Sequence, residues 1–325
     1  MFAPLPPRPS LLRRLFRRAT ALTGETLVDP RAYQPALPLP EGFSRDRIHD
    51  ILTEVSVDKS ARGELRAYAS IDCDRFLHTL ALVPDDARGS LVEIGAGPYF
   101  TTLLLRRFRP NMALTLLNYF HTGKKDGKQA IVFPGFDGVE ESFDFHYDNV
   151  NIEVATLPYA DASFDYMVFC EVLEHLTNNP VRALMELKRV LKPGGRMILT
   201  TPNAARLENA VAFIEGRNIY DQYSAYGPYG RHNREYTRTE LHKLMIACGF
   251  EPEVSFTANV HPDYPPQFAG ASAVNAVLSS VPDRGHDLGQ YIFTRWVNAS
   301  PSDGKLPWWL YRSYNPDCMG DPAHG

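Results

Sequence analysis

The residues best suited to chemistry lie in "EVLEHL", residues 171–176, directly after the apolar run "FDYMVF". If this stretch begins a helix, Glu171, Glu174 and His175 project from one face, because residues three and four apart are neighbours on a helix. A further imidazole, His232, lies in the later segment "GRHNREYTRTEL". Two carboxylates and two imidazoles form a mixed oxygen and nitrogen set. Such a set suits a divalent ion such as Mg²⁺ or Mn²⁺ and leaves positions open for a substrate hydroxyl.

Two other interpretations of these residues stay open. In a metal-free site, His175 or His232 would be the catalytic general base near neutral pH, with Glu171 as a further catalytic candidate. Alternatively, the carboxylates are solvated groups at the capped start of a helix, with no chemical role.

Seven short segments rich in apolar residues predict the strands that position this cluster. They are residues 90–95, 113–118, 151–157, 164–170, 196–201, 250–258 and 290–297. Residues 46–82 have helical spacing, and helical or loop segments separate most of the strands. This alternation predicts an α/β fold with a doubly wound, seven-stranded, mainly parallel sheet covered on both faces. Ligands bind such a sheet at the carboxyl ends of its strands.

Two long segments interrupt this alternation. Residues 119–151 contain "AIVFPG" and "ESFDFHYD", which could pair as an inserted hairpin. Residues 203–236 begin with a helical pattern and then break at glycine and proline, so we expect a lid on the substrate side. Its tyrosines offer flat faces that suit a sugar ring, or they pack the lid onto the sheet. The candidate substrate residues are Tyr223, Tyr226, Tyr229 and Arg231.

The turn "LVEIGAGPYF" places Gly95 and Gly97 after the first apolar strand. Small residues there let the backbone approach a ligand closely. A nicotinamide fingerprint would need a third glycine at Phe100 and an acid at the end of the next strand, which instead ends in Asn118. We expect Glu93 to bond an ammonium group of the ligand or to order the turn.

Three motifs in this order, "EIGAGP", "LPYADASFDYMVFCEVLEHL" and "ELKRVLKPGGRMILTTPN", resemble the class I S-adenosylmethionine-dependent methyltransferases. The resemblance covers roughly residues 60–300 and implies a Rossmann-like fold with S-adenosylmethionine as cofactor. It places the methionine part at the glycine turn, the ribose at Asn118 and the adenine amino group at Glu153. The cofactor residues that it implies are Glu93, Gly95, Ala96, Gly97, Asn118, Glu153, Val154 and Cys170.

The E-x-x-E-H pattern with a later histidine is similar to the magnesium site of small-RNA 3′-terminal 2′-O-methyltransferases. A related pattern occurs in ubiquinone-pathway O-methyltransferases. In these proteins the metal binds vicinal hydroxyls and lowers the pKa of the attacking one. The resemblance thus implies the metal ligands Glu171, Glu174, His175 and His232. The lid also looks like that of methyltransferases associated with bacterial surface-polysaccharide and glycolipid synthesis.

The composition of the chain bounds its class. The formal net charge of −4 over 325 residues gives no electrostatic case for nucleic acid. Four separated cysteines without a C-x-x-C pair favour a reducing cytoplasm. We expect a basic helix and Pro-rich linker over residues 1–45, a methyltransferase domain over 46–300 and a tail over 301–325. Arginines within residues 10–20 predict a peripheral contact with anionic lipid, a transit peptide or a basic tail.

Together these features predict a cytoplasmic O-methyltransferase that uses S-adenosylmethionine and acts on a sugar or glycan hydroxyl. Two alternatives stay open. One is an O-methyltransferase of a small phenolic or quinone-type lipid, and the other is a catalytically silent cofactor-binding protein.

Overall fold

The computed structural model describes residues 35–58, 62–120, 123–261, 271–281, 284 and 286–320. The predicted basic N-terminal helix and its contact with lipid therefore lie outside the described residues. Within the described part, no helix is both long enough and apolar enough to cross a bilayer.

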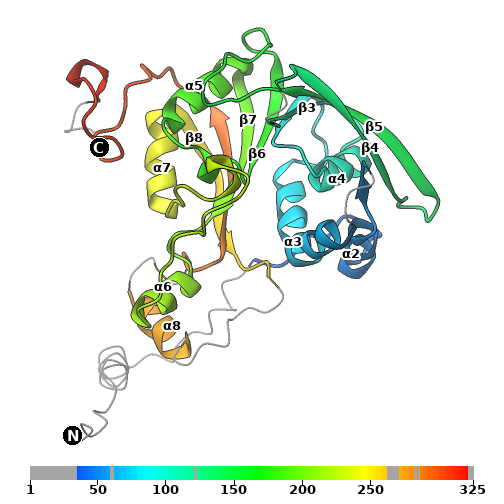
Figure 1. Cartoon of the computed structure of the whole chain (residues 1–325), viewed down its shortest axis with the longest axis horizontal. Coiled ribbons are helices and arrows are strands. Elements are labelled where there is room, and N and C mark those ends of the chain that lie inside the picture. The colour runs from blue at the N-terminus through cyan, green and yellow to red at the C-terminus, as the bar shows by residue number, and fades with distance from the viewer. Residues whose placement is uncertain are drawn as a thin grey trace, which may run out of the picture.

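A single twisted sheet forms the centre of the described chain (Figure 1). Its nine strands run in the order β1-β4-β5-β3-β2-β6-β7-β9-β8. Strands β3, β2, β6 and β7 are parallel to one another, whereas β9 and β8 are antiparallel at one side. The strands are β1 (Ser56–Val57), β2 (Gly89–Ile94), β3 (Met112–Asn118), β4 (Asp126–Pro134), β5 (Glu140–Asn149), β6 (Phe164–Cys170), β7 (Leu191–Pro202), β8 (Phe250–Ala258) and β9 (Tyr291–Asn298).

Helices cover both faces of this sheet, as a doubly wound fold requires (Figure 1). Helices α2, α3 and α4 lie on one face, α5 and α7 lie on the other, and α6 and α8 pack together beyond one end. The helices are α2 (Arg45–Thr53), α3 (Arg62–Leu82), α4 (Phe100–Phe108), α5 (Pro180–Val190), α6 (Leu207–Ile214), α7 (Arg238–Ala247) and α8 (Ala271–Ser279), with 3-10 turns at η2 (Leu173–His175), η3 (Pro228–Gly230) and η4 (Pro316–Cys318). The fold class predicted from the sequence is confirmed.

The apolar spacing of the helices explains which side each one buries. In α5, the buried face includes Val181, Leu184 and Leu187, which pack with Met197 and Leu199 of β7 in one of two large core clusters. Each such side chain contributes about 1.5–3 kcal/mol on burial. Asn179 caps α5 by accepting a hydrogen bond from the amide of Arg182.

The hairpin expected between residues 119 and 151 is present as β4 and β5, which pair antiparallel from Asp126↔Asp148 to Pro134↔Glu140. The strand expected over residues 151–157 was wrong, because these residues contain turns and no strand. The position beside β3 is taken by the end of β5, which pairs parallel with it at Leu117↔Asp148 and Asn118↔Asn149. Together with the short β1, this replacement gives nine strands in place of the expected seven.

Two helix predictions also need correction. The helical spacing of residues 46–82 divides into α2 and α3, with β1 between them. "EVLEHL" forms only the 3-10 turn η2, because Glu171 has a left-handed backbone (φ 55°) and α5 begins later at Pro180.

Candidate functional site

The candidate residues gather at the carboxyl ends of β2, β6 and β7, which lie side by side in the sheet. The glycine turn follows β2, Glu171 and η2 follow β6, and the lid follows β7. Because parallel strands end at the same edge, the topology brings together residues that are far apart in the sequence.

Gly95 and Gly97 are exposed at this edge, whereas Ala96 between them is buried. Gly95 has φ +74°, and a Cβ atom there would lie 2.6 Å from Val172 Cγ2. A side chain at Gly95 would therefore meet both backbone strain and a clash. The exposed backbone of this turn fits the methionine cradle that the resemblance implies.

Glu93 lies beneath the turn and is 4% exposed. Its Oε2 accepts a hydrogen bond of 2.5 Å from Thr102 Oγ1, and burial raises the pKa of Glu93 to about 8. These contacts fit the expectation that Glu93 orders the glycine turn by linking β2 to α4. Its expected bond to a ligand ammonium stays a prediction.

Asn118 holds the other side of the turn. Its Oδ1 accepts from the amide of Gly97 at 2.8 Å, and its Nδ2 donates to the hydroxyl of Tyr99 at 3.1 Å. Tyr99 is fully buried with φ +76°, and its hydroxyl donates to Gln129 of the hairpin at 2.6 Å. The amide of Asn118 thus bonds two residues of the turn, and Tyr99 joins the turn to the hairpin. The expected contact of Asn118 with ribose stays a prediction.

Glu153 is buried, and its carboxylate accepts hydrogen bonds from the backbone amides of residues 177–179 and from Thr177 Oγ1. Burial alone would raise its pKa, but these hydrogen bonds outweigh burial and lower it. The hydroxyl of Tyr229 also donates to Glu153, at 3.0 Å. The adenine contact stays a prediction for Glu153 and for Val154, which is exposed. Cys170 is partly buried at the end of β6.

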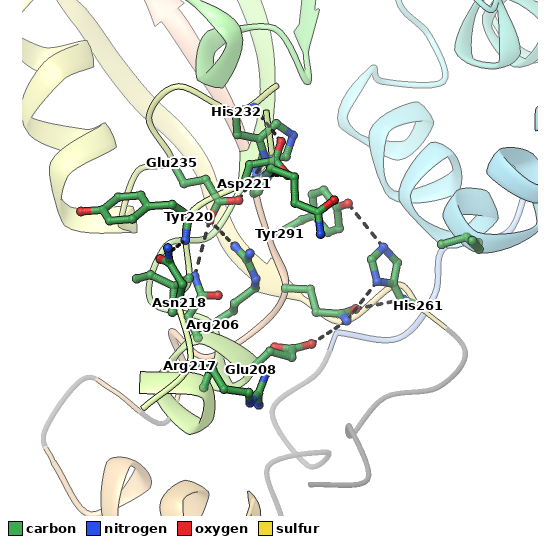
Figure 2. Close-up of a pocket in the computed structure, with 17 residues that line it drawn as sticks. Arg206, Glu208, Arg217, Asn218, Tyr220, Asp221, His232, Glu235, His261 and Tyr291 are labelled. Atoms are coloured by element: carbon green, nitrogen blue, oxygen red, sulfur yellow. Dashed lines mark hydrogen bonds and ion pairs between the residues drawn. The ribbon is translucent and has the colours of Figure 1, made fainter. Parts of the chain in front are cut away.

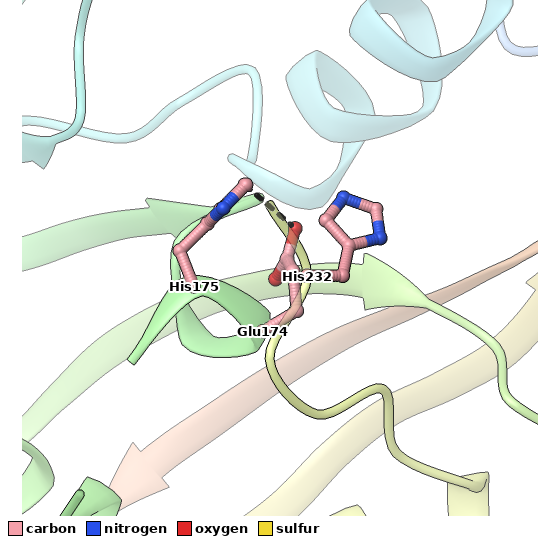
Figure 3. Close-up of side chains that lie close together, drawn as sticks. All are labelled: Glu174, His175 and His232. Carbon is pink, nitrogen blue, oxygen red and sulfur yellow. Dashed lines mark ion pairs between the residues drawn. The ribbon is translucent and has the colours of Figure 1, made fainter. Parts of the chain in front are cut away.

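Three of the four predicted metal ligands meet in one cluster. Glu174, His175 and His232 each offer a ligand atom, and these atoms lie within 4.8 Å of one another. The carboxylate of Glu174 lies between the two imidazoles (Figure 3). Glu174 is fully buried, and its Oε1 has no hydrogen-bond partner among the described residues. A buried carboxylate oxygen without a partner is costly, so this atom fits a cation that the two imidazoles would share.

Hydrogen bonds orient both imidazoles of the cluster. His175 Nδ1 lies 2.9 Å from the carbonyl oxygen of Arg231, and His232 Nδ1 lies 3.0 Å from Glu235 Oε1. Because both partners are acceptors, each Nδ1 carries the proton when the ring is neutral, and each Nε2 keeps its lone pair. Metal-binding histidines usually have such an outer partner. Glu235, which is in turn paired with Arg206, was not predicted, although it lies only three residues after His232.

The charges of the cluster depend on one another. Burial raises the pKa of Glu174, while burial and the nearby His232 lower the pKa of His175. Burial also opposes the charged form of His232, but the hydrogen bond to Glu235 and the Glu174 carboxylate outweigh it and raise the pKa of His232. A cation would favour the deprotonated form of all three ligands.

Glu171 lies apart from this cluster, although it was predicted as a ligand. Its Oε1 accepts from Thr200 Oγ1 at 2.7 Å and lies 4.0 Å from Arg75 Nη1. Burial raises the pKa of Glu171 to about 8 in spite of Arg75. Arg75 itself is buried in α3 and pairs with Asp72 at 3.0 Å. The i, i+3 spacing of Asp72 and Arg75 was the available signal for this pair, which the sequence analysis did not use.

None of the four predicted substrate residues lines the cavity that adjoins the cluster. Tyr223 and Tyr226 are 92% and 80% exposed, and the guanidinium of Arg231 stacks on the ring of Tyr223. Tyr229 packs against Tyr119. The cavity has a volume of about 760 Å³ and is lined in part by His232, so it adjoins the cluster (Figure 2).

Comparison with known proteins identifies the family of the chain. A family model described as a methyltransferase domain matches residues 65–253, more than half of the chain. The chain therefore belongs to the S-adenosylmethionine-dependent methyltransferase family, and S-adenosylmethionine is the cofactor of that family.

Two curated relatives have similar printed names. The protein from Mycolicibacterium smegmatis, named as a probable S-adenosylmethionine-dependent methyltransferase, is 36% identical over 110 residues, which are 33% of this chain and 37% of that protein. A protein with a corresponding name from Mycobacterium tuberculosis is 35% identical over 97 residues, 30% of each chain. These matches span about a third of the length of each relative.

Solved structures with a related fold are more distant in sequence. A SAM-dependent methyltransferase from Archaeoglobus fulgidus is 12% identical and matches 78% of this chain and 94% of its own, with a TM-score of 0.43. The YcgJ protein from Bacillus subtilis is 17% identical and matches 69% of this chain and 99% of its own, with a TM-score of 0.41.

Proposed function

We propose that the protein is an O-methyltransferase that transfers the methyl group of S-adenosylmethionine to a sugar or glycan hydroxyl, with a divalent ion held by Glu174, His175 and His232. The observation that carries this proposal is the cluster itself. Its three ligand atoms converge within 4.8 Å. The buried Oε1 of Glu174 has no hydrogen-bond partner among the described residues and lies 3.9 Å from His175 Nε2.

The donor set bears on the kind of ion. One carboxylate and two neutral imidazoles can bind Mg²⁺ or Mn²⁺, although they select these ions less strongly than an all-oxygen set would. They also leave coordination positions for two hydroxyls of an acceptor. When bound, such an ion lowers the pKa of a coordinated hydroxyl. Vicinal hydroxyls are common in sugars, so a sugar ring can use two adjacent positions.

The residues of the chain orient and deprotonate the acceptor. In the transfer, the acceptor oxygen attacks the methyl carbon, the new C–O bond forms as the S–C bond breaks, and S-adenosylhomocysteine leaves. The hydroxyl proton must pass to a base. Glu171 is the member of the predicted catalytic set that lies apart from the ligand cluster. Since burial raises its pKa to about 8, Glu171 can accept this proton only in its ionised form, whose share increases as the pH rises toward 8. In the metal-free alternative, His175 or His232 has this role.

The experiment that tests the proposal uses the full chain with S-adenosylmethionine labelled in its methyl group. Separate glycan and lipid extracts are the acceptors, each with EDTA or with added Mg²⁺ or Mn²⁺. We expect label in the glycan pool that resists alkali, because a methyl ether survives conditions that hydrolyse a methyl ester. EDTA should remove this activity, and either metal should restore it.

The histidine variants provide the matched comparison. His232→Ala should abolish transfer, whereas His49→Ala should retain it, because His49 lies on α2 away from the cluster. Label that appears only in the lipid pool would instead support a phenolic or quinone-type acceptor. Full activity after exhaustive removal of metal would refute the role of the ion and favour a histidine base.

A further inference from the structure

The cavity beside His232 has a lining with a distinct chemical character (Figure 2). It lies between the start of α6, the lid, the loop after β8 and the start of β9. Its volume of about 760 Å³ is in the range of small-molecule sites. Because His232 belongs both to this cavity and to the cluster with Glu174, a molecule bound here lies next to the proposed metal.

The charged groups of the lining disfavour an anionic ligand. The guanidinium of Arg206 is paired with Glu235, and that of Arg217 with Glu215. Glu208 and Asp221 add further negative charge to the wall. Both arginines of the lining are therefore paired, and a phosphate or carboxylate would also meet the carboxylates of Glu208, Asp221 and Glu235.

The neutral polar groups of the lining favour hydroxyls. Four side-chain amides line the cavity, together with the ring of Tyr291: Asn209, Asn218, Gln222 and Gln290. Hydrogen bonds within the chain hold Asn209 and Gln290, whereas the exposed amides of Asn218 and Gln222 can donate to a ligand hydroxyl. A purely apolar ring would form no hydrogen bond with Asn218 or Gln222.

Glu208 has an unused hydrogen-bond acceptor at this wall. Its Oε1 accepts from Gln290 Nε2 at 2.6 Å, whereas its Oε2 is buried and has no partner among the described residues. Gln290 is fixed in turn, because its Oε1 accepts from the amides of Val260 and His261 at 2.9 Å each. A rigid carboxylate with one oxygen unsatisfied calls for a donor from a ligand, and a hydroxyl is such a donor.

We propose that this cavity binds the acceptor as a neutral polyhydroxylated ring, and that Glu208 accepts hydrogen bonds from ring hydroxyls other than the one that is methylated. This inference rests on the proposed function, because it takes the acceptor of that reaction as the ligand. It assigns the recognition of the sugar to Glu208 and the lining of this cavity, in place of the exposed Tyr223 and Tyr226.

The test measures binding separately from turnover. The full chain, saturated with S-adenosylhomocysteine and Mg²⁺, is examined by saturation-transfer NMR with defined probes. The probes are methyl glucoside, methyl mannoside and methyl galactoside, with glucose 1-phosphate and catechol as the charged and phenolic comparisons. We expect at least one neutral glycoside to bind, and to bind more tightly than either comparison probe.

Glu208→Gln is the informative variant, because glutamine keeps an oxygen for the bond from Gln290 and replaces only the unused acceptor with a donor. It should weaken glycoside binding about tenfold or more, since a hydrogen bond to a charged group is lost. Glu208→Asp should recover part of the affinity. Glu140→Gln, which changes an exposed carboxylate on the hairpin away from this cavity, should have no effect. None of the three should change binding of Mg²⁺ or of S-adenosylhomocysteine.

The outcomes separate the two proposals. Preferential binding of catechol or glucose 1-phosphate, no binding of any glycoside, or glycoside binding that ignores Glu208→Gln would each overturn the inference. If methyl transfer to a hydroxyl is found but does not depend on Glu208, the function stands and this site falls. If a glycoside binds through Glu208 but no hydroxyl is methylated, the site stands and the proposed function falls.

Discussion

Glu174→Gln should remove most of the stabilisation that a divalent ion gives to the folded protein. The change keeps the shape of the side chain and an oxygen for the bond from Thr201 Oγ1, which is 2.9 Å long. It removes the charge on the carboxylate whose Oε1 has no hydrogen-bond partner among the described residues. If this charge holds the ion, the variant loses one of three ligands, and a metal site that lacks a ligand binds poorly.

The expected magnitude follows from linkage. An ion at a concentration one hundred times its Kd stabilises the folded state by about 2.7 kcal/mol. For a domain of this size, each kcal/mol raises the Tm by about 2–4 °C, so Mn²⁺ should raise the Tm of the natural protein by about 5–10 °C. If Glu174→Gln weakens binding about a hundredfold, the same concentration equals the new Kd, and the shift falls to below about 2 °C.

Thermal unfolding with and without Mn²⁺, combined with calorimetry of Mn²⁺ binding, measures both quantities. Glu171→Gln is the matched control, because its carboxylate accepts from Thr200 and faces Arg75 rather than joining the cluster. We expect it to weaken binding of Mn²⁺ by less than tenfold. The reasoning is refuted if Mn²⁺ does not shift the Tm of the natural protein, or if the two variants lose the shift equally.

Three further predictions concern the support of the site. Burial raises the pKa of the Glu93 carboxyl to about 8, so between its ordinary pKa of 4.5 and pH 8 the folded state keeps the carboxyl proton while the unfolded state loses it. The free energy of unfolding therefore falls as pH rises through that window, by at most about 5 kcal/mol. In Glu93→Gln this dependence on pH should flatten, and an unchanged slope would contradict the placement of Glu93. Gly95→Ala should reduce the free energy of unfolding more than Gly216→Ala in denaturant titrations. Both glycines have positive φ, but only Gly95 adds a clash, with Val172, and equal losses would mean that this contact is relieved at little cost. Glu153→Ala should destabilise the protein by about 2–4 kcal/mol, because it leaves the amide groups before α5 without an acceptor, and a loss below about 0.5 kcal/mol would show that water replaces the carboxylate.

The sequence predicted the central strands well because each is a short apolar run bounded by turn residues. The strand expected over residues 164–170 is observed as β6 with the same bounds. The failure at residues 151–157 has a tertiary cause. The hairpin supplies β5 as the neighbour of β3, and local apolar pattern cannot show which of two segments takes a position in a sheet.

The candidate site was predictable where the ligands are close in sequence or follow a known pattern. Glu174, His175 and His232 were found in this way and lie together. Their supporting groups were not found, because the bond from His232 to Glu235 and the position of Glu171 opposite Arg75 depend on side-chain directions. Helical spacing also misplaced Glu171, since its left-handed backbone turns it away from the face that a helix would give.

The hairpin of β4 and β5 can change in length without changing the site. It joins the parallel part of the sheet through only two residue pairs, at Leu117↔Asp148 and Asn118↔Asn149, whereas its own strands pair over their full length. Its turn exposes Val139 but buries Phe136 in the core against Phe43 and Phe108, so a longer hairpin must keep these contacts. Because side chains alternate between faces every second residue, two residues added to each strand would extend the hairpin and keep every existing side chain on its face. Among related chains and in engineered variants, this arm is therefore where new contacts with a large acceptor or another protein can be added while the fixed end at Asn118 stays in place.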